Sequence, residues 1–163
     1  MESIDLLVLR TARDWLAAGD RVMLATVART WGSSPRPVGS MMALRNDGRV
    51  VGSVSGGCIE DDLIHRYTTA YGGDGLTDSA PEVVRYGVSA DEAHRFGLPC
   101  GGTLELILEF CPSWQSLEQL LAQLDAGRLV RRRLALMGNA VTLEPTATPE
   151  QFSFDGQQMS NTL

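Results

Sequence analysis

Two cysteines stand in glycine-rich turns, a setting that favours thiol chemistry or ligand binding. Cys58 follows the glycines of "GSVSGGC" and precedes "IEDDLI", where a helix is expected to begin, and Cys100 lies in "FGLPCGG". Backbone N–H groups at a helix start stabilise a thiolate, whereas the acids at 60–62 oppose it. A free cysteine can equally pack as a small apolar residue, so both interpretations of Cys58 stay open. Because glycine lets a backbone approach a ligand closely, the shared setting suggests a common ligand or chemistry.

The loop "RTWGSSPRPVGS" (29–40) is a second candidate for ligand binding. Its prolines and glycines exclude a helix. The donors that this loop supplies without acidic neighbours are Arg29, Ser33, Ser34 and Arg36. Arginine forks and hydroxyl groups suit a phosphate or another oxyanion. The alternative is that Trp31 and the prolines only pack the loop.

The glycine turn before Cys58 could also hold an anion by itself, because N–H groups at a helix start attract negative charge. Glu60, Asp61 and Asp62 already complement the helix dipole there and would repel an anion, so capping by these acids is the competing interpretation. The dinucleotide pattern G-x-G-x-x-G does not occur in this turn. The third cysteine, Cys111, lies outside such a setting and is expected to be structural.

The composition is that of one globular domain, with 163 residues, 44% apolar and 21% charged. The net charge is −6, and the basic run "RRR" at 131–133 is expected to face solvent on a strand, so nucleic acid is not an expected partner. The absence of lysine excludes a Walker phosphate loop and Schiff-base chemistry. The chain shows neither an apolar run of roughly 20 residues nor a secretion signal, so we expect a cytoplasmic protein.

Hydrophobic periodicity predicts the elements that position these motifs. The expected helices cover 4–16, 59–71 and 114–124, and the expected strands cover 21–30, a hairpin over 40–55, 82–86, 103–110 and 129–138. The strand at 103–110 alternates apolar and polar residues and is expected to be half buried. The order of elements predicts an α/β or α+β fold, with a mixed β-sheet and flanking helices in a single domain. Residues 139–163 are expected to form irregular strands or a tail.

Two long blocks carry a specific resemblance. Residues 26–64, "TVARTWGSSPRPVGSMMALRNDGRVVGSVSGGCIEDDLI", and residues 96–109, "FGLPCGGTLELILE", together resemble the N-terminal domain of the XdhC/CoxI family, the xanthine dehydrogenase accessory factors. The resemblance assigns residues 1–138 to this domain. It also implies that 139–163 lead toward a C-terminal dinucleotide-fold domain, which this sequence does not contain.

The resemblance implies a maturation factor rather than an enzyme. Family members bind molybdenum cofactor (molybdopterin) as cargo, support its sulfuration together with a cysteine desulfurase, and deliver it to xanthine dehydrogenase or a related molybdenum hydroxylase. Either Cys58 or Cys100 could then ligate molybdenum or carry sulfur as a persulfide, because both tasks need a thiolate. The implied cofactor-binding residues are Arg29, Ser33, Ser34, Arg36, Gly56, Gly57, Cys58, Cys100 and Gly101.

Two other classes of function stay open at this point. A thiol-dependent sulfurtransferase would use Cys58 as its nucleophile. A dimerisation or docking module would have no cofactor chemistry of its own, and its glycine-rich turns would serve packing alone. A homo-oligomer is expected, with neither nucleic acid nor a membrane span.

Overall fold

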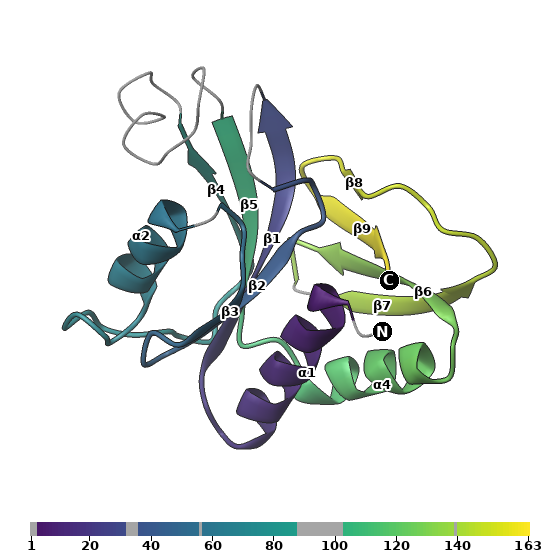
Figure 1. Ribbon diagram of the computed structural model, residues 1–163, viewed down its shortest axis with the longest axis horizontal. Coiled ribbons are helices and arrows are strands. Elements are labelled where there is room, and N and C mark those ends of the chain that lie inside the picture. The colour runs from purple at the N-terminus through teal and green to yellow at the C-terminus, as the bar shows by residue number, and fades with distance from the viewer. Residues whose placement is uncertain (1–2, 32–35, 56, 88–102, 139) are drawn as a thin grey trace.

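The structure is a computed structural model, and it describes residues 3–31, 36–55, 57–87, 103–138 and 140–163. Its elements, labelled in Figure 1, are α1 (Ile4–Ala17), β1 (Val22–Trp31), β2 (Met41–Arg45), β3 (Val50–Gly52), α2 (Cys58–Tyr67), β4 (Glu82–Tyr86), β5 (Thr103–Phe110), α4 (Trp114–Asp125), β6 (Leu129–Ala135), β7 (Val141–Thr146), β8 (Ser153–Phe154) and β9 (Gln158–Thr162). Within the described residues, no helix is long and apolar enough to cross a membrane.

The described strands form two antiparallel sheets. The first has the strand order β3-β2-β1-β5-β4 and the second the order β7-β6-β9-β8. Sheets with flanking helices in one small domain confirm the predicted fold class. Since all strand pairs in the described ranges are antiparallel, the α+β alternative describes the molecule better.

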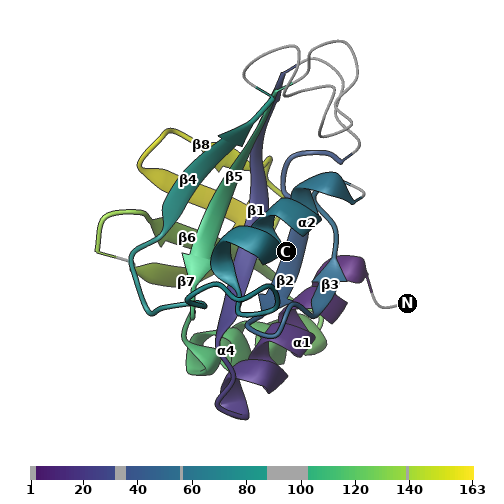
Figure 2. The ribbon, with the colours of Figure 1, turned by 90° about the vertical axis from the view of Figure 1, so that its left-hand side faces the viewer.

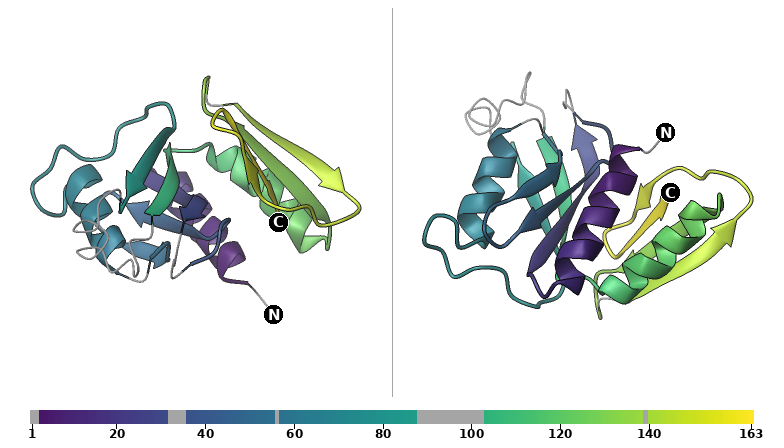
Figure 3. Two further views of the ribbon diagram at one scale, coloured as in Figure 1. Left: turned by 90° about the horizontal axis from the view of Figure 1, so that it is seen from above. Right: turned by 60° about the horizontal axis from the view of Figure 1, so that its bottom comes forward.

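The first sheet has α2 on one face and α1 on the other, as Figures 1 and 2 show, and each face carries an apolar cluster. On one face, Ile59 and Leu63 of α2 pack into a buried cluster with alternate residues of β1 and β5. On the other face, Leu9 of α1 and Leu120 of α4 share a second cluster with β1, β2 and β6. Figure 3 shows α1 and α4 side by side, with α1 against the first sheet and α4 against the second. Burying both faces makes the first sheet the centre of the molecule.

The caps of α1 and α4 explain why these helices begin where they do. The Ser3 hydroxyl accepts a hydrogen bond from the Leu6 N–H at 3.2 Å, and the Ser113 hydroxyl accepts one from the Ser116 N–H at 3.2 Å. Both predicted helices are confirmed. The helix predicted over 59–71 ends at Tyr67, because Thr68 takes an extended conformation and its hydroxyl bonds the Ile64 carbonyl.

Two predictions about burial are wrong. Strand β5 is buried along almost its whole length rather than half buried, because the second sheet covers the face that carries Glu105 and Glu109. Within the 131–133 triplet, Arg132 is buried and pairs with Glu109, so only its neighbours in the triplet are partly exposed. The strand alternation explains the difference, since Val130, Arg132 and Leu134 share the inward face of β6.

Residues 141–162 supply three of the four strands of the second sheet. Strands β7 and β9 pair on either side of β6, and β8 pairs with β9. Met159 and Leu134 are buried against Ala28 and Ile107 of the first sheet. The two sheets are thereby joined by an apolar contact as well as by the polar contacts described below.

Candidate functional site

At one end of the first sheet, β1 and β4 end and β5 begins. At this end Trp31, the last residue of β1, pairs with Thr103, the first residue of β5, and Tyr86 at the end of β4 pairs with Leu104. Strand β3 also runs toward this end, because Gly52 pairs with Met42 near the start of β2. We call this the loop end of the sheet; it lies at the top of Figure 1. Helix α2 follows β3 after a short turn, so Cys58 lies on the α2 side of the sheet, toward the loop end.

Cys58 is the first residue of α2, and it is exposed. Gly57 before it has a φ of 152°, a conformation that a residue with a side chain rarely adopts. Among the described residues, a Cβ at Gly57 would meet no atom within 4 Å, so these residues leave the space in front of this backbone open. Both the thiol and the glycine backbone are therefore accessible to a ligand.

A buried carboxylate supports the turn that leads to Cys58. Glu60 points inward, where the Ser53 hydroxyl donates to its Oε2 at 3.0 Å and the Ser55 hydroxyl donates to its Oε1. The Ser55 oxygen also accepts the Gly57 N–H at 3.4 Å. The Glu60 charge is thus offset by hydroxyl donors instead of facing a ligand at the helix start. The sequence predicted only a helix-capping role for Glu60, although its short spacing from Ser53 and Ser55 could have indicated these contacts.

A second polar group attaches α2 to strand β4. The Tyr86 hydroxyl donates to Asp62 Oδ2 at 2.6 Å, and Arg66 Nη1 donates to the Tyr86 oxygen at 3.3 Å. Arg66 also forms an ion pair with Asp62 at 3.6 Å. Burial, together with the neighbouring Asp62 carboxylate, raises the pKa of Tyr86, so its hydroxyl remains a proton donor. Asp62 is therefore held by partners from α2 and β4.

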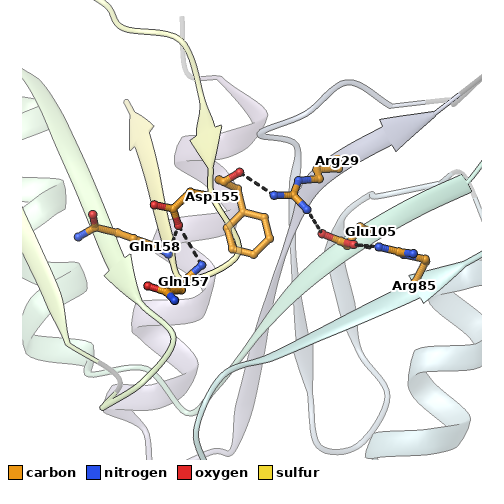
Figure 4. Close-up of polar contacts among 7 residues, drawn as sticks. Arg29, Arg85, Glu105, Asp155, Gln157 and Gln158 are labelled. Carbon is orange, nitrogen blue, oxygen red and sulfur yellow. Dashed lines mark hydrogen bonds and ion pairs between the residues drawn. The ribbon is translucent and has the colours of Figure 1, made fainter.

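Arg29 lies between the two sheets, as Figure 4 shows. Its Nη1 donates to Glu105 Oε1 at 3.4 Å and its Nη2 donates to the Phe154 carbonyl at 3.0 Å, with Cζ 4.8 Å from the centre of the Phe154 ring. Arg85 donates to the same Glu105 at 2.8 Å and stacks on Trp31. The assignment of Arg29 to an anion site stays a prediction, and these contacts count against it.

Of the other predicted site residues, Arg36 lies within the described part of the chain and five do not. Arg36 is half-buried and acts electrostatically on Asp5 of α1: burial raises the pKa of Asp5, and the Arg36 charge opposes that rise. The predictions that lie outside the described residues are Ser33, Ser34, Gly56, Cys100 and Gly101. The structure therefore places Gly57 and Cys58 together toward the loop end, whereas the contacts of Arg29 and Arg36 go to other elements.

The other side chains that could take part in chemistry, Cys111 and His65, have environments that indicate a structural role. Cys111 is half-buried, and its N–H donates to the Val22 carbonyl at the end of the sheet opposite Cys58. His65 stacks on Tyr71 with 3.9 Å between ring centres. Within the described ranges, no group of three or more His, Cys, Asp and Glu side chains is arranged to hold a metal ion.

A small α+β domain that presents a thiol and open glycine backbone toward one end of a sheet is suited to holding a ligand there. Residues 15–87 match the model of the XdhC and CoxI family. The resemblance inferred from the sequence motifs is therefore confirmed.

Two curated relatives and one solved structure place the chain more closely. The molybdenum cofactor insertion chaperone PaoD of Escherichia coli (strain K12) is 30% identical over 149 residues, which is 91% of this chain and 45% of PaoD. A probable xanthine dehydrogenase subunit of Bacillus subtilis (strain 168) is 30% identical over 82 residues, 50% of this chain and 23% of that protein. A crystal structure described as a xanthine dehydrogenase from Bacillus halodurans aligns with a TM-score of 0.67 and 27% identity, covering 97% of this chain and 52% of that one. The chain thus spans about half the length of the relatives that it matches over most of its own length.

Proposed function

We propose that this chain binds molybdenum cofactor as cargo and supports its insertion into xanthine dehydrogenase or a related molybdenum hydroxylase. The observation that carries the proposal is the exposed Cys58 thiol beside the open Gly57 backbone toward the loop end. The name of PaoD, a molybdenum cofactor insertion chaperone, supports the choice of cargo. Soft thiolate ligands and backbone N–H donors suit the metal and the anionic parts of such a cofactor, respectively.

Cys100 is the second thiol of the proposed site. It lies outside the described residues, but it precedes Thr103 by three positions. Thr103 begins β5 at the loop end, and β3, which leads into α2, runs toward the same end. This chain order supports a site to which both thiols contribute.

Retention of the cofactor tests this proposal. Purified chain is mixed with molybdenum cofactor, and the bound fraction is measured after gel filtration for the wild type, Cys58→Ala and Cys100→Ala. We expect each substitution to weaken binding at least about tenfold, which corresponds to about 1.4 kcal/mol. Cys111→Ala is the matched control, because this half-buried thiol lies at the opposite end of β5 and its loss should leave retention unchanged. Wild-type affinity in both test variants would show that the thiols do not hold the cofactor.

A role in sulfuration is a second candidate, favoured by the exposure of the Cys58 thiol. The Cys58 thiolate would attack the outer sulfur of a cysteine desulfurase persulfide, forming a new S–S bond while the desulfurase cysteine leaves as a thiolate. Mass spectrometry should then find one added sulfur on Cys58 after incubation with desulfurase and cysteine. A sulfurtransferase in its own right would also pass that sulfur to an acceptor over many turnovers. A single loading without turnover would instead support the chaperone.

A further inference from the structure

A small cavity lies at the N-terminus of α4, far from Cys58 along the first sheet. Its volume is about 200 Å³, and its lining consists of Pro112, Ser113, Ser116, Arg132 and Val141. A water molecule takes about 30 Å³ of liquid volume, so this cavity has room for a larger group. The lining combines two hydroxyl groups with one cationic side chain, a polar combination that suits a negatively charged ligand.

The buried Arg132 side chain has one donor without a partner in the described part of the chain. Arg132 is 3% exposed. Its Nη1 donates to Glu109 Oε2 at 3.0 Å and its Nη2 donates to Glu109 Oε1 at 2.5 Å, whereas the buried Nε has no hydrogen-bond acceptor among the described residues. A guanidinium carries five N–H donors in a planar fork, so the edge formed by Nε and Nη2 can still bind an oxyanion. A buried donor without an acceptor is costly, so an acceptor from a bound group would stabilise this side chain.

The start of α4 supplies a second set of donors to the same cavity. This helix has 12 residues, and its first turn contains no acidic side chain. The first N–H groups of a helix have no partner within the helix and attract negative charge. Ser113, the N-cap, and Ser116 both line the cavity, and the Ser113 oxygen already binds the Ser116 N–H. The Ser113 hydroxyl itself donates to Gln115 Oε1 at 3.2 Å, so the donors left for an anion are the Ser116 hydroxyl and the remaining first-turn N–H groups.

The nearby acids limit the affinity without blocking the site. Glu109 offsets the charge of Arg132 from the far side of the guanidinium, and Arg131 and Arg133 pair with Glu144, with Arg131 also bound to Glu150. The local charge is thus close to balanced, and binding depends on directed donors more than on net charge. We propose that this cavity binds a small tetrahedral oxyanion, namely phosphate or the phosphoryl group of a larger molecule, between Arg132 Nε and the N-terminus of α4.

The substitution Ser116→Asp tests phosphate binding without removing the buried pair of Arg132 and Glu109. Ser116→Asp places a carboxylate in the cavity lining, where it repels an oxyanion, while an acid in the first turn is favourable for the helix. We expect inorganic phosphate to raise the melting temperature of the wild-type chain in a saturable way, at constant ionic strength maintained with chloride. In Ser116→Asp the apparent phosphate affinity should fall at least about tenfold, with a melting temperature no lower than that of the wild type when phosphate is absent.

Gln119→Asp is the matched control, because it makes the same change of charge at an exposed position one turn further along α4. It should keep the phosphate response of the wild type. The Arg132 Nε–H resonance gives a direct readout and should shift with phosphate, and glycerol phosphate as a second probe distinguishes a free ion from a phosphoryl group. The proposal is wrong if neither probe moves the wild-type resonance, or if Ser116→Asp responds to phosphate as the wild type does.

Discussion

At the scale of single residues, Glu60 is the side chain that most directly shapes the approach to Cys58. It accepts hydrogen bonds from the hydroxyls of Ser53 and Ser55, and Ser55 in turn contacts the Gly57 N–H. Glu60→Ala removes the acceptor that both hydroxyls use. We expect the free energy of unfolding to fall by about 1–3 kcal/mol, as measured by urea denaturation, and cofactor retention to fall with it.

Asp61→Ala provides the matched control for Glu60. Asp61 is exposed in the same helical turn, so its removal should change stability by no more than about 0.5 kcal/mol. Equal losses in the two variants would mean that Glu60 acts only through the helix dipole, as its place in the first turn predicts, rather than through the serine contacts.

The buried pair of Arg132 and Glu109 offers a second prediction at this scale. Burial opposes the charge of Arg132, but the adjacent Glu109 carboxylate raises the pKa of Arg132 above its usual value. Arg132→Met leaves the Glu109 carboxylate buried without its partner, and we expect a loss of about 3–5 kcal/mol in the free energy of unfolding. The double variant Arg132→Met, Glu109→Met should recover most of that loss, because two apolar side chains need no partner.

Arg133→Met controls for the general effect of removing an arginine from β6. Arg133 is half-buried and its ion pair with Glu144 spans 3.8 Å, so the expected loss is below about 1 kcal/mol. Chemical denaturation of the four proteins completes the comparison. Single and double variants that lose the same free energy would contradict the assignment of a tightly paired charge.

The burial of Arg132 could have been predicted from the sequence by considering which residues of the strand share a face. The run "VRRRL" alternates such that Val130, Arg132 and Leu134 share one face of a strand. Glu105 and Glu109 are spaced by four and share one face of β5, which offered acidic partners for an inward arginine. Interpreting the triplet by composition alone assigned it to solvent. The pairing partner itself was not predictable, because it depends on how the two sheets meet.

At the scale of elements, the approach of β3 to β2 and α1 depends on Gly52. Its φ is +86°, and a Cβ there would lie 2.5 Å from the Met41 carbonyl oxygen and 2.5 Å from Val8 Cγ2. Gly19, just after α1, has a similar φ of +92°, but no atom of the described residues lies within 4 Å of its Cβ position. The two glycines thus share a backbone conformation but differ in how closely other atoms surround their Cβ positions.

This difference predicts unequal costs for the same substitution. Gly19→Ala should lower the free energy of unfolding by about 1 kcal/mol, the cost of a left-handed conformation. Gly52→Ala should lose that amount and a further ~2 kcal/mol from overpacking. Thermal or urea unfolding measures both. Similar losses would show that the backbone around Gly52 shifts to admit a methyl group.

The hairpin of β2 and β3 gives a prediction about pH. Hydrogen bonds from Arg45, and then from the Arg49 N–H, lower the pKa of Asp47 to about 2. Because this pKa is below the unfolded value of about 3.9, the ionised carboxylate stabilises the fold above pH ~4, and the benefit is lost as the pH falls toward 2. The pair is exposed, so the loss should stay below about 1 kcal/mol. Urea denaturation from pH 5 to 2 should show a shallower decline for Asp47→Asn than for the wild type, and identical declines would contradict the assignment.

The local elements were largely predictable from the sequence, because their signals are local. The hairpin followed from "NDG" at 46–48, and the strand at 82–86 has the predicted bounds. The end of α2 was not predictable from periodicity, since Ala70 and Tyr71 continue the apolar pattern beyond the helix. Tyr71 instead stacks on His65, a contact between side chains that no helical pattern encodes.

At the scale of the whole molecule, the site was predictable in part. The helix start at Cys58 followed from its glycines and the apolar pattern behind them, and Cys58 does begin α2. The sequence did not predict which strands meet at the loop end. That arrangement depends on the pairing of Trp31 with Thr103, which are separated by more than 70 positions. The second sheet, built mainly from 141–162, packs on the first sheet through side chains that are far apart in the sequence. Such contacts leave no periodic signal in either segment.

The joint between the two sheets can be tested through Arg29. Both Arg29 and Arg85 contact Glu105, but only Arg29 also reaches the second sheet, at the Phe154 carbonyl and ring. Arg29→Gln and Arg85→Gln each leave Glu105 with one arginine, so neither variant strands a buried carboxylate without a cation. A hydrogen bond from a charged donor contributes roughly 1.5–3 kcal/mol, so losing the Arg29 contacts should increase opening of the second sheet at least about tenfold.

Amide hydrogen exchange of β9 measures that opening, with the buried Met159 and Asn161 as reporters. In Arg29→Gln, exchange at these amides should accelerate while exchange at α2 stays as in the wild type. In Arg85→Gln, the acceleration should be confined to β4 and its neighbour β5, because Arg85 contacts only the first sheet among the described residues. Equal acceleration of β9 in both variants would mean that Glu105, and not Arg29, joins the sheets. No acceleration in either would mean that the apolar contact of Leu134 and Met159 with Ala28 and Ile107 holds them together without the arginine.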